Sequence, residues 1–369
     1  MKVGIVKEHK AGEGRVAATP ANVKKLIDAG TQVMVEDQAG AGSGFENSAY
    51  EAVGAKIVSH EQAWDADLVV KVKEPEPEEY KYFKKGQAIW GFQHLASTPE
   101  TVKAMEKAGV TAIGGETIVA NGQLALLKPM SAIAGRRSVI MGAYYLESQH
   151  GGEGILLPGT PEVPAGKVVF FGGGNAAVNG AELALAMGCE VSVIELKQKR
   201  IEWLQRHFQG QRFKAISSTP ENLAAEIKTA DVFISTILIP GARPPKLVTE
   251  EMVKSMKKGS VLIDVAIDQG GTVETIDHPT TIEDPVFTKY GVIHYAVPNQ
   301  PGAVPRTATM ALSKGNIKYL MEIAHSGIYA AIKRDEALAS GINVYQGQVV
   351  NEGLAKSVNS DYHKLDDLL

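Results

Sequence analysis

A glycine-rich segment between two apolar runs constrains the fold of this chain more than any other feature. Residues 167–195 read KVVFFGGGNAAVNGAELALAMGCEVSVIE. The order of residue types predicts a buried strand, a tight turn, a closely packed helix and a second buried strand. Gly172, Gly174 and Ala177 have the G-x-G-x-x-A spacing of a dinucleotide-binding turn, in which glycine lets the backbone approach a pyrophosphate. The N-terminus of the helix would offer free N–H groups and a partial positive charge to the phosphates.

Glu195 ends the second predicted strand, where a carboxylate can bind both hydroxyls of an adenosine ribose. An acid at this position favours NAD over NADP, because it would repel a 2′-phosphate. The basic residues Lys197, Lys199 and Arg200 follow closely. The alternative interpretation is that they bind a phosphate, as in an NADP site. We expect NAD, since NADP sites usually lack the acid.

Length and composition limit the classes of protein to which the chain can belong. A chain of 369 residues exceeds one ordinary core and predicts two domains. The composition, 44% hydrophobic and 22% charged, is typical of a soluble globular protein. The formal net charge of −4 does not indicate the basic surface that binds nucleic acid.

The N-terminus carries charges where a secretion signal would be apolar, and no apolar segment is long enough to span a membrane. The single cysteine, Cys189, is expected to be a buried apolar residue. We therefore expect a cytoplasmic protein without nucleic-acid or membrane partners.

The rest of the chain also alternates strands and helices. Residues 1–128 show this pattern but contain no glycine fingerprint of their own. A long helix is predicted over about 131–148, before a proline-rich loop that leads to the dinucleotide strand. Helices are also predicted near residues 329–339 and 349–355.

The C-terminal segment is too short for a domain of its own, so we expect it to pack on the first part of the chain. The predicted organisation is α/β with two Rossmann-like domains. Residues 1–128 and 307–369 form a discontinuous substrate domain, into which an NAD-binding domain, residues 129–306, is inserted.

Four polar residues follow predicted strands, at the edge where open α/β sheets bind ligands: Arg15, Lys73, His94 and Asp268. The forked guanidinium of Arg15 suits a carboxylate, and His94 can act as an acid or base near neutral pH. The structural alternatives are that Arg15 is a solvated loop charge and that His94 is a structural histidine.

Lys71 and Lys73 should share a face of one strand, so the sequence gives little basis for choosing between them as the site residue. Asp264 and Asp268 flank three apolar residues, and an aspartate at the end of a buried strand is costly unless paired or used.

Two other kinds of site are not expected from the sequence. No Cys/His cluster has the spacing of metal ligands. No G-x-S-x-G elbow of a serine hydrolase is present either.

On these residues the chain resembles the L-alanine dehydrogenase family, which is related to the NAD-binding subunit of proton-translocating transhydrogenase. The resemblance extends over nearly the whole chain. The segments that carry it are KEHKAGEGRVAATP with Arg15, ADLVVKVKEP with Lys73, FQHLA with His94, LLKPMSAIAGR with Ser131, the GGGNAA turn, IPGARPPKLV, VLIDVAIDQGG with Asp268, and VPNQPGAVPRTAT with Asn299.

The resemblance implies a reversible conversion of L-alanine, NAD⁺ and water to pyruvate, ammonium and NADH. It implies that Arg15 and Lys73 hold the substrate carboxylate and carbonyl, while His94 and Asp268 move protons. The cofactor would be bound by Ser131, Gly172, Gly173, Gly174, Asn175, Ala176, Glu195 and Asn299. The family also implies a cleft that closes on its ligands and, commonly, a homohexamer.

The chain departs from the family pattern at a few positions, none of which is a proposed catalytic group: Ala132, Ala177, Glu195, Gln300 and Ala308. Two other functions stay open. One is a dehydrogenase of another amino acid, such as the glycine/glyoxylate pair, and the other is a non-catalytic NAD-binding protein. The four polar candidates argue against the non-catalytic protein, because a protein that only binds NAD does not need all four of them. The lack of a membrane segment argues against a transhydrogenase subunit.

Overall fold

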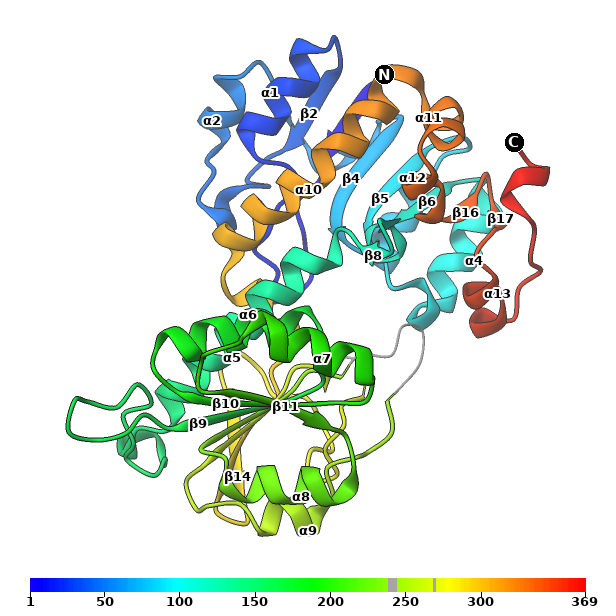
Figure 1. Ribbon diagram of the computed structural model, residues 1–369. Helices are drawn as coiled ribbons and strands as arrows, with labels where there is room; N and C mark the ends of the chain where they lie inside the picture. Colours follow the sequence, from blue (N-terminus) through cyan, green and yellow to red (C-terminus); the bar gives the residue numbers. More distant parts are fainter. Residues whose placement is uncertain (238–243, 268–269) are drawn as a thin grey trace. The chain divides into compact units, whose positions relative to one another are not determined.

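The structure, a computed structural model, describes residues 1–237, 244–267 and 270–369. The chain forms two compact units. The first comprises Met1–Met130 and Gly302–Leu369, and the second comprises Ser131–Pro301. In each unit a β-sheet lies between layers of helices (Figure 1).

The first unit contains an eight-stranded sheet in the order β17-β16-β6-β5-β4-β1-β2-β3. Strands β1 to β6 run parallel, whereas β16 and β17 are antiparallel additions at one edge. The strands are β1 (Lys2–Ile5), β2 (Gln32–Glu36), β3 (Lys56–Val58), β4 (Leu68–Lys73), β5 (Ala88–Phe92), β6 (Thr111–Gly114), β16 (Ile342–Tyr345) and β17 (Gln348–Val349). Strands β4 and β5 are almost entirely buried, as expected for a parallel sheet covered on both faces.

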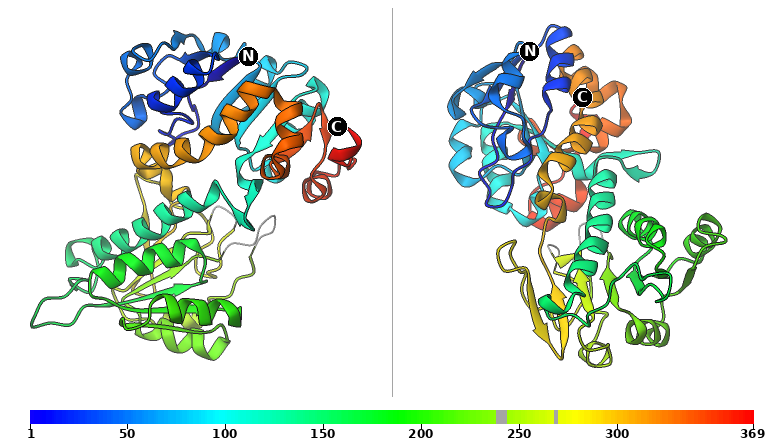
Figure 2. Two further views of the ribbon diagram at one scale, coloured as in Figure 1. Left: turned by 45° about the horizontal axis from the view of Figure 1, so that its top comes forward. Right: turned by 90° about the vertical axis from the view of Figure 1, so that its left-hand side faces the viewer.

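Helices cover both faces of this sheet (Figure 2). Helices α1 and α10 pack together on one face, and α3, α4 and α13 contribute to one apolar cluster on the other. The helices are α1 (Pro20–Asp28), α2 (Asn47–Glu51), α3 (His60–Trp64), α4 (Pro99–Ala108), α10 (Pro305–Ser326), α11 (Ile328–Arg334), α12 (Glu336–Ser340) and α13 (Glu352–Val358). A two-stranded ribbon of β7 (Val119–Ala120) and β8 (Gln123–Leu124) completes the unit.

The C-terminal segment differs from its prediction. Two strands that were not predicted, β16 and β17, lie between the two predicted helices, and α13 begins at Glu352 rather than near residue 349. Strand β16 pairs with β6, which precedes the whole second unit in the chain. A short strand whose partner is so distant in sequence has no local signal that distinguishes it from a loop.

The second unit contains a seven-stranded sheet in the order β11-β10-β9-β12-β13-β15-β14. All neighbouring strands are parallel except β14, which is antiparallel to β15. The strands are β9 (Lys167–Phe171), β10 (Glu190–Glu195), β11 (Phe213–Ser217), β12 (Val232–Ser235), β13 (Val261–Asp264), β14 (Val286–Lys289) and β15 (Val292–Tyr295). Helices α5 (Leu127–Tyr145), α6 (Asn175–Ala186) and α7 (Gln198–His207) lie on one face, and α8 (Pro220–Thr229) and α9 (Glu250–Lys254) on the other (Figure 1). Cys189 is fully buried in the core, as predicted.

Helix α5 begins at Leu127, four residues earlier than predicted, and ends at Tyr145 rather than Ser148. Pro129 is its third residue, a position where the backbone N–H has no partner within the helix, so proline is tolerated there. Glycine allows α5 to pack closely on α6. A Cβ added to Gly135 would lie 1.9 Å from the carbonyl oxygen of Ala176, and one added to Gly180 would lie 2.9 Å from the Gly135 carbonyl.

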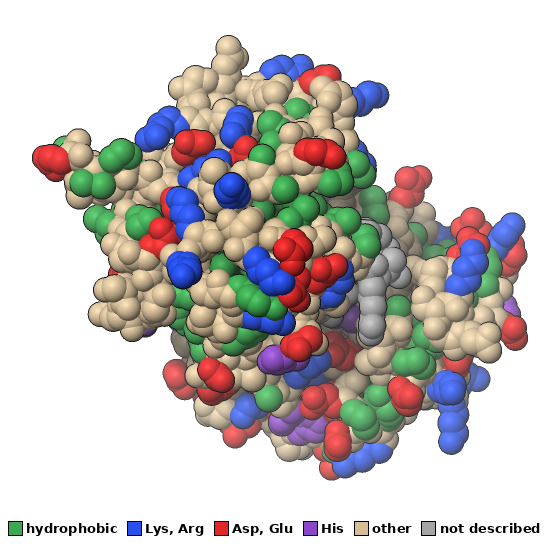
Figure 3. Space-filling view, turned by 90° about the horizontal axis from the view of Figure 1, so that it is seen from below, with side chains coloured by type: hydrophobic (Ala, Val, Ile, Leu, Met, Phe, Trp, Pro, Cys, Tyr) green, Lys and Arg blue, Asp and Glu red, His purple; other side chains and the backbone are tan. Residues whose placement is uncertain are grey.

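Acidic and basic side chains are interspersed on the face shown in Figure 3, and neither sign forms a continuous patch there. Among the described residues, no helix is long and apolar enough to cross a membrane.

Candidate functional site

In the first unit, β1 lies between β2 and β4, so consecutive strands extend from it in both directions. Such a switch point is the usual ligand site of an open parallel sheet, at the carboxyl ends of the strands. Arg15 lies in the segment after β1, Lys73 is the last residue of β4, and His94 follows β5 by two residues. Because β1, β4 and β5 are parallel neighbours, three of the four predicted polar residues come to one edge of the sheet.

Arg15 is only 3% exposed and its guanidinium is held in place. Its Nε donates to Glu13 Oε1 at 2.7 Å, and its Nη2 donates to the other carboxylate oxygen. Its Nη1 lies 3.5 Å from Met130 Sδ. The guanidinium therefore has a fixed orientation, as specific recognition of a carboxylate requires.

Helix α10 holds the backbone that follows Arg15. Thr309 Oγ1 accepts the N–H of Val16 at 3.0 Å, and Ser313 Oγ accepts the N–H of Thr19 at 2.9 Å. Asn316 Nδ2 donates to the Ala17 carbonyl at 3.2 Å. These bonds fix residues 16–19 to a helix from the C-terminal part of the chain.

Lys71 and Lys73 do not share an environment, contrary to the prediction. Val70 pairs with Trp90 and Lys73 with Phe92, so β4 contains one residue more than β5 between these pairs. This bulge breaks the strict alternation of faces on which the prediction rested.

The two lysines consequently differ in their partners. Lys71 is 1% exposed, and its Nζ lies 2.9 Å from Glu79 Oε1 and 3.7 Å from Glu8 Oε2. Burial alone would lower the pKa of Lys71, but the two carboxylates raise it above its ordinary value. Burial, followed by the nearby positive charge of Arg15, lowers the pKa of Lys73. Lys71 is thus a structural cation, and Lys73 is available for a ligand.

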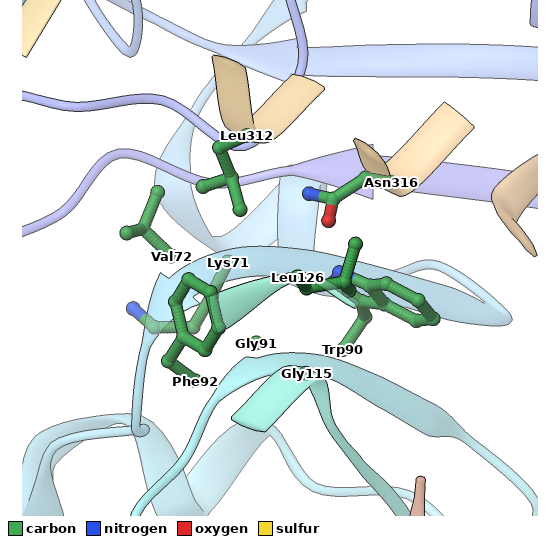
Figure 4. Close-up of a pocket in the computed structure, with 9 residues that line it drawn as sticks. All are labelled: Lys71, Val72, Trp90, Gly91, Phe92, Gly115, Leu126, Leu312 and Asn316. Atoms are coloured by element: carbon green, nitrogen blue, oxygen red, sulfur yellow. The ribbon is translucent and has the colours of Figure 1, made fainter. Parts of the chain in front are cut away.

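A narrow gap separates α10 from strands β4 and β5 (Figure 4). The gap is too narrow to admit a water molecule. Figure 4 shows Leu312 and Asn316 of α10 on one side and the side chains of Lys71, Trp90 and Phe92 on the other. This gap is part of the packed interior and offers no room for a substrate.

His94 has a left-handed backbone, with φ 43°, which is uncommon for a residue with a side chain. Glu116 stabilises it by accepting the N–H of His94 at 2.8 Å and that of Gln93 at 3.1 Å. Burial, and then the charge of Lys73, lowers the pKa of His94 to about 4. The imidazole is therefore neutral at pH 7 and able to accept a proton. Strain of this kind at a half-buried histidine is typical of functional sites.

Glu13 and Glu116 hold Arg15 and His94, and sequence reasoning identified neither residue. The nearness of Glu13 to Arg15 in GEGR was a signal for the first of them. Glu116 lies after a different strand, β6, and its sequence contains no comparable signal.

In the second unit, the turn between β9 and α6 has the geometry that its glycines predicted. Gly172 has φ 99°, which favours glycine. A Cβ added to Gly174 would meet no heavy atom within 4 Å, so the backbone is open to a ligand there. Ala177 is fully buried below the turn, where it lets the helix lie close to the sheet. No side chain caps the N-terminus of α6, whose N–H groups point toward this turn.

Glu195 ends β10 beside the turn. Its Oε2 accepts the N–H of Gly173 at 2.8 Å, and its Oε1 accepts the N–H of Lys197 at 2.8 Å. Arg200 Nε donates to the Gly173 carbonyl at 2.7 Å. The carboxylate thus lies against the backbone that would surround the adenosine ribose.

Ser131 and Asn299 belong to the same unit as this turn. Ser131 lies on α5 one turn before Gly135, so both are on the helix face that packs on the start of α6. Asn299 is half-buried and has φ 52°. Gln300, one of the departures from the family pattern, is buried and accepts a hydrogen bond from Arg137.

Asp264 is fully buried, and burial raises its pKa. Its carboxylate accepts the N–H groups of Ala266 at 3.0 Å and Thr272 at 2.8 Å, which closes the loop after β13. Asp264 is therefore a structural residue. Asp268, the fourth predicted polar residue, lies outside the described residues.

One Rossmann-like unit has a glycine turn beside an acid, and the other has a cationic sheet edge with a neutral histidine. This combination is typical of a dinucleotide-dependent dehydrogenase. The family models for the alanine dehydrogenase/PNT N-terminal and C-terminal domains match residues 4–134 and 138–352. The chain belongs to the alanine dehydrogenase/PNT family.

Individual relatives agree with this assignment over the full length. Alanine dehydrogenase 1 of Staphylococcus aureus (strain MSSA476) is 63% identical over 368 residues, which are 99% of each chain. A solved L-alanine dehydrogenase is 42% identical with a TM-score of 0.92, over 97% of this chain and 99% of the other. A transhydrogenase from Sinorhizobium meliloti is 28% identical with a TM-score of 0.82, over 95% and 99%. The predicted fold and family are thereby confirmed, and the family implies an amino-acid dehydrogenase with a nicotinamide cofactor.

Proposed function

We propose that this protein catalyses the reversible NAD-dependent deamination of L-alanine: L-alanine, water and NAD⁺ give pyruvate, ammonium, NADH and a proton. The observation that carries the proposal is the set of Arg15, Lys73 and a neutral His94 at the switch point of one sheet. Two cations suit a 2-oxo acid, and a neutral base suits the addition of water to an imine. The relatives named above supply the choice of alanine.

Each polar residue has a role that follows from its chemistry. Arg15 binds the substrate carboxylate, and Lys73 draws electron density toward the carbonyl oxygen of pyruvate. In the deamination direction His94 accepts a proton from the water that attacks the imine carbon, which yields a carbinolamine. Collapse of the carbinolamine releases ammonia and forms the carbonyl. By family resemblance, Asp268 shares the proton transfers.

The second unit fits the dinucleotide. We propose that the pyrophosphate binds at the open backbone of Gly174 and the N-terminus of α6, with Glu195 on the adenosine ribose. The remaining proposed contacts are Ser131, Gly172, Gly173, Asn175, Ala176 and Asn299. The dinucleotide held by these residues would supply the hydride acceptor for deamination and the hydride donor for the reverse reaction. We further propose that residues 129–306 bind the cofactor and that residues 1–128 with 307–369 bind the substrate.

Replacing Glu195 by alanine is expected to weaken the preference for NAD⁺ over NADP⁺ by about tenfold or more, because the charge that repels a 2′-phosphate is lost. The measurement is the ratio of kcat/KM for the two cofactors. Glu195 also holds the N–H of Gly173, so Glu195→Gln, which keeps an acceptor oxygen, is the matched variant. If the ratio of kcat/KM for NAD⁺ and NADP⁺ is unchanged in both variants, other groups determine which ribose is bound.

The experiment that tests the proposed function is NADH consumption by the purified protein with pyruvate and ammonium. Parallel reactions replace pyruvate by glyoxylate, replace NADH by NADPH, or omit ammonium. We expect rapid turnover that needs both pyruvate and ammonium and is much slower with NADPH. Faster turnover with glyoxylate would assign the enzyme to glycine instead. NADH binding without turnover of either 2-oxo acid would indicate a non-catalytic protein.

We also propose that the protein is a cytoplasmic homo-oligomer, a hexamer by family resemblance. Apolar side chains exposed on the second unit support self-association, since monomers rarely leave such groups together in water. Ile140 and Tyr144, one turn apart on α5, are 53% and 45% exposed. Leu156 and Val163, in the loop after α5, are each 59% exposed. Light scattering during size-exclusion chromatography measures the assembly directly.

A further inference from the structure

Three potential metal ligands, far apart in sequence, meet in the first unit at a place that the proposed reaction does not use. Glu36 is the last residue of β2, and His60 is the first residue of α3, two residues after the end of β3. His9 lies in the segment after β1. Strands β1, β2 and β3 are parallel neighbours, so their carboxyl ends bring the three side chains together. The sequence contains no local ligand spacing because each residue follows a different strand.

The carboxylate of Glu36 lies between the two imidazoles. Its Oε1 is 3.3 Å from His9 Nε2, and its Oε2 is 2.9 Å from His60 Nδ1. One ligand atom from each residue lies within 4.8 Å of the other two. A tetrahedral ion with bonds of about 2.1 Å needs ligand atoms about 3.4 Å apart, so small side-chain rotations would complete the geometry. The two rings are edge to face, 5.0 Å apart, and neither blocks the other.

The surrounding groups orient these ligands. The N–H of Lys7 donates to Glu36 Oε2 at 2.8 Å, which fixes the carboxylate. The second nitrogen of His60, Nε2, is 3.9 Å from Glu79 Oε1. A carboxylate near the second nitrogen of a metal-bound histidine is a recurring arrangement, because it sets the tautomer and the direction of the ring.

The local charge also favours a cation. Glu8, Glu36 and Glu79 are 7%, 5% and 3% exposed, and Lys71 is the buried amine beside them. Three buried carboxylates therefore lie near one buried lysine, so acidic groups are in excess there.

Solvent can reach the cluster. A cavity of about 350 Å³ is lined by His9, His60, Glu76, Glu78, Glu79, Lys81 and Tyr82. It leaves space for a water molecule or a further carboxylate as the fourth ligand.

We propose that His9, Glu36 and His60 bind a divalent transition-metal ion of the zinc class. Two imidazoles and one carboxylate suit Zn²⁺, Co²⁺ or Ni²⁺, whereas Mg²⁺ and Ca²⁺ prefer oxygen ligands alone. The ion would connect the segment after β1, which also carries Arg15, to the ends of β2 and β3. The proposal is independent of the enzymatic activity, since it concerns other residues and another ligand.

The test is calorimetric titration of the chelator-treated, full-length protein with ZnCl₂, followed by absorption spectroscopy with CoCl₂. The variants are His9→Gln and His60→Gln. The matched control is His278→Gln, because His278 also pairs with a carboxylate, Asp277, but has no third ligand among the residues that the structure describes. We expect one Zn²⁺ per chain in the native protein and in the control. Each cluster variant should bind at least about tenfold more weakly and lose the visible Co²⁺ absorption of a four-coordinate site.

Circular dichroism checks that each variant is folded, and His9 is the safer substitution because its side chain is 47% exposed. Two results would overturn the proposal. One is the lack of stoichiometric Zn²⁺ binding by the native protein, which would leave the two histidines only as hydrogen-bond partners of Glu36. The other is equal affinity in the native protein and both cluster variants, which would place the ion elsewhere.

Discussion

Replacing His94 by alanine is expected to lower kcat for pyruvate amination by at least about two decades. The neutral imidazole is the group that exchanges a proton with the attacking water or ammonia. Because the pKa of His94 is about 4, nearly every molecule has this base in its active form at pH 7. The measurement is steady-state NADH oxidation at saturating pyruvate and ammonium.

The matched control is His325→Ala, which removes an exposed histidine from α10 in the same unit. NADH affinity should be unchanged in both variants, since the proposed cofactor contacts lie in the second unit. A His94→Ala enzyme that keeps more than about a tenth of the native kcat would remove His94 from the proton transfer.

Replacing Lys71 by methionine is expected to destabilise the first unit by about 3–5 kcal/mol. Methionine fills a similar volume but leaves the buried carboxylates of Glu8 and Glu79 without their shared cation. Lys73→Met is the variant for comparison. It should reduce turnover strongly but lower the stability of the first unit much less than Lys71→Met does.

Unfolding by denaturant, followed by tryptophan fluorescence, measures this difference. Trp64 and Trp90 lie in the first unit, and the third tryptophan, Trp203, lies in the second. A Trp203→Phe background therefore restricts the signal to the first unit. Equal unfolding midpoints for Lys71→Met and its parent would show that Lys71 is not a required structural cation.

The sequence predicted best what depends on neighbouring residues. The turn at Gly172–Gly174, the buried Ala177 and the acid at Glu195 belong to one β-α-β unit, so spacing alone determines how they lie. The positions of the polar residues after strands made them candidates, and resemblance to a known family then predicted a role for each of them.

What the sequence could not predict depends on contacts between distant segments. Lys71 and Lys73 have different surroundings because of a bulge against β5, and a bulge has no reliable signal in its own strand. The carboxylates of Glu13 and Glu116 orient Arg15 and His94 through the loops after β1 and β6. The cluster of His9, Glu36 and His60 forms only when three strands align, so a search for local ligand spacing found none.

The hydrogen bonds from α10 to residues 16–19 also have a consequence for the order in which the protein matures on the ribosome. The second unit is one continuous stretch of chain, so it can fold as soon as it emerges. The first unit must wait, because Thr309, Ser313 and Asn316, which hold the backbone beside Arg15, are translated after the entire second unit. We therefore expect nascent chains to acquire cofactor binding before substrate binding, and their incomplete N-terminal half to be the part that chaperones protect.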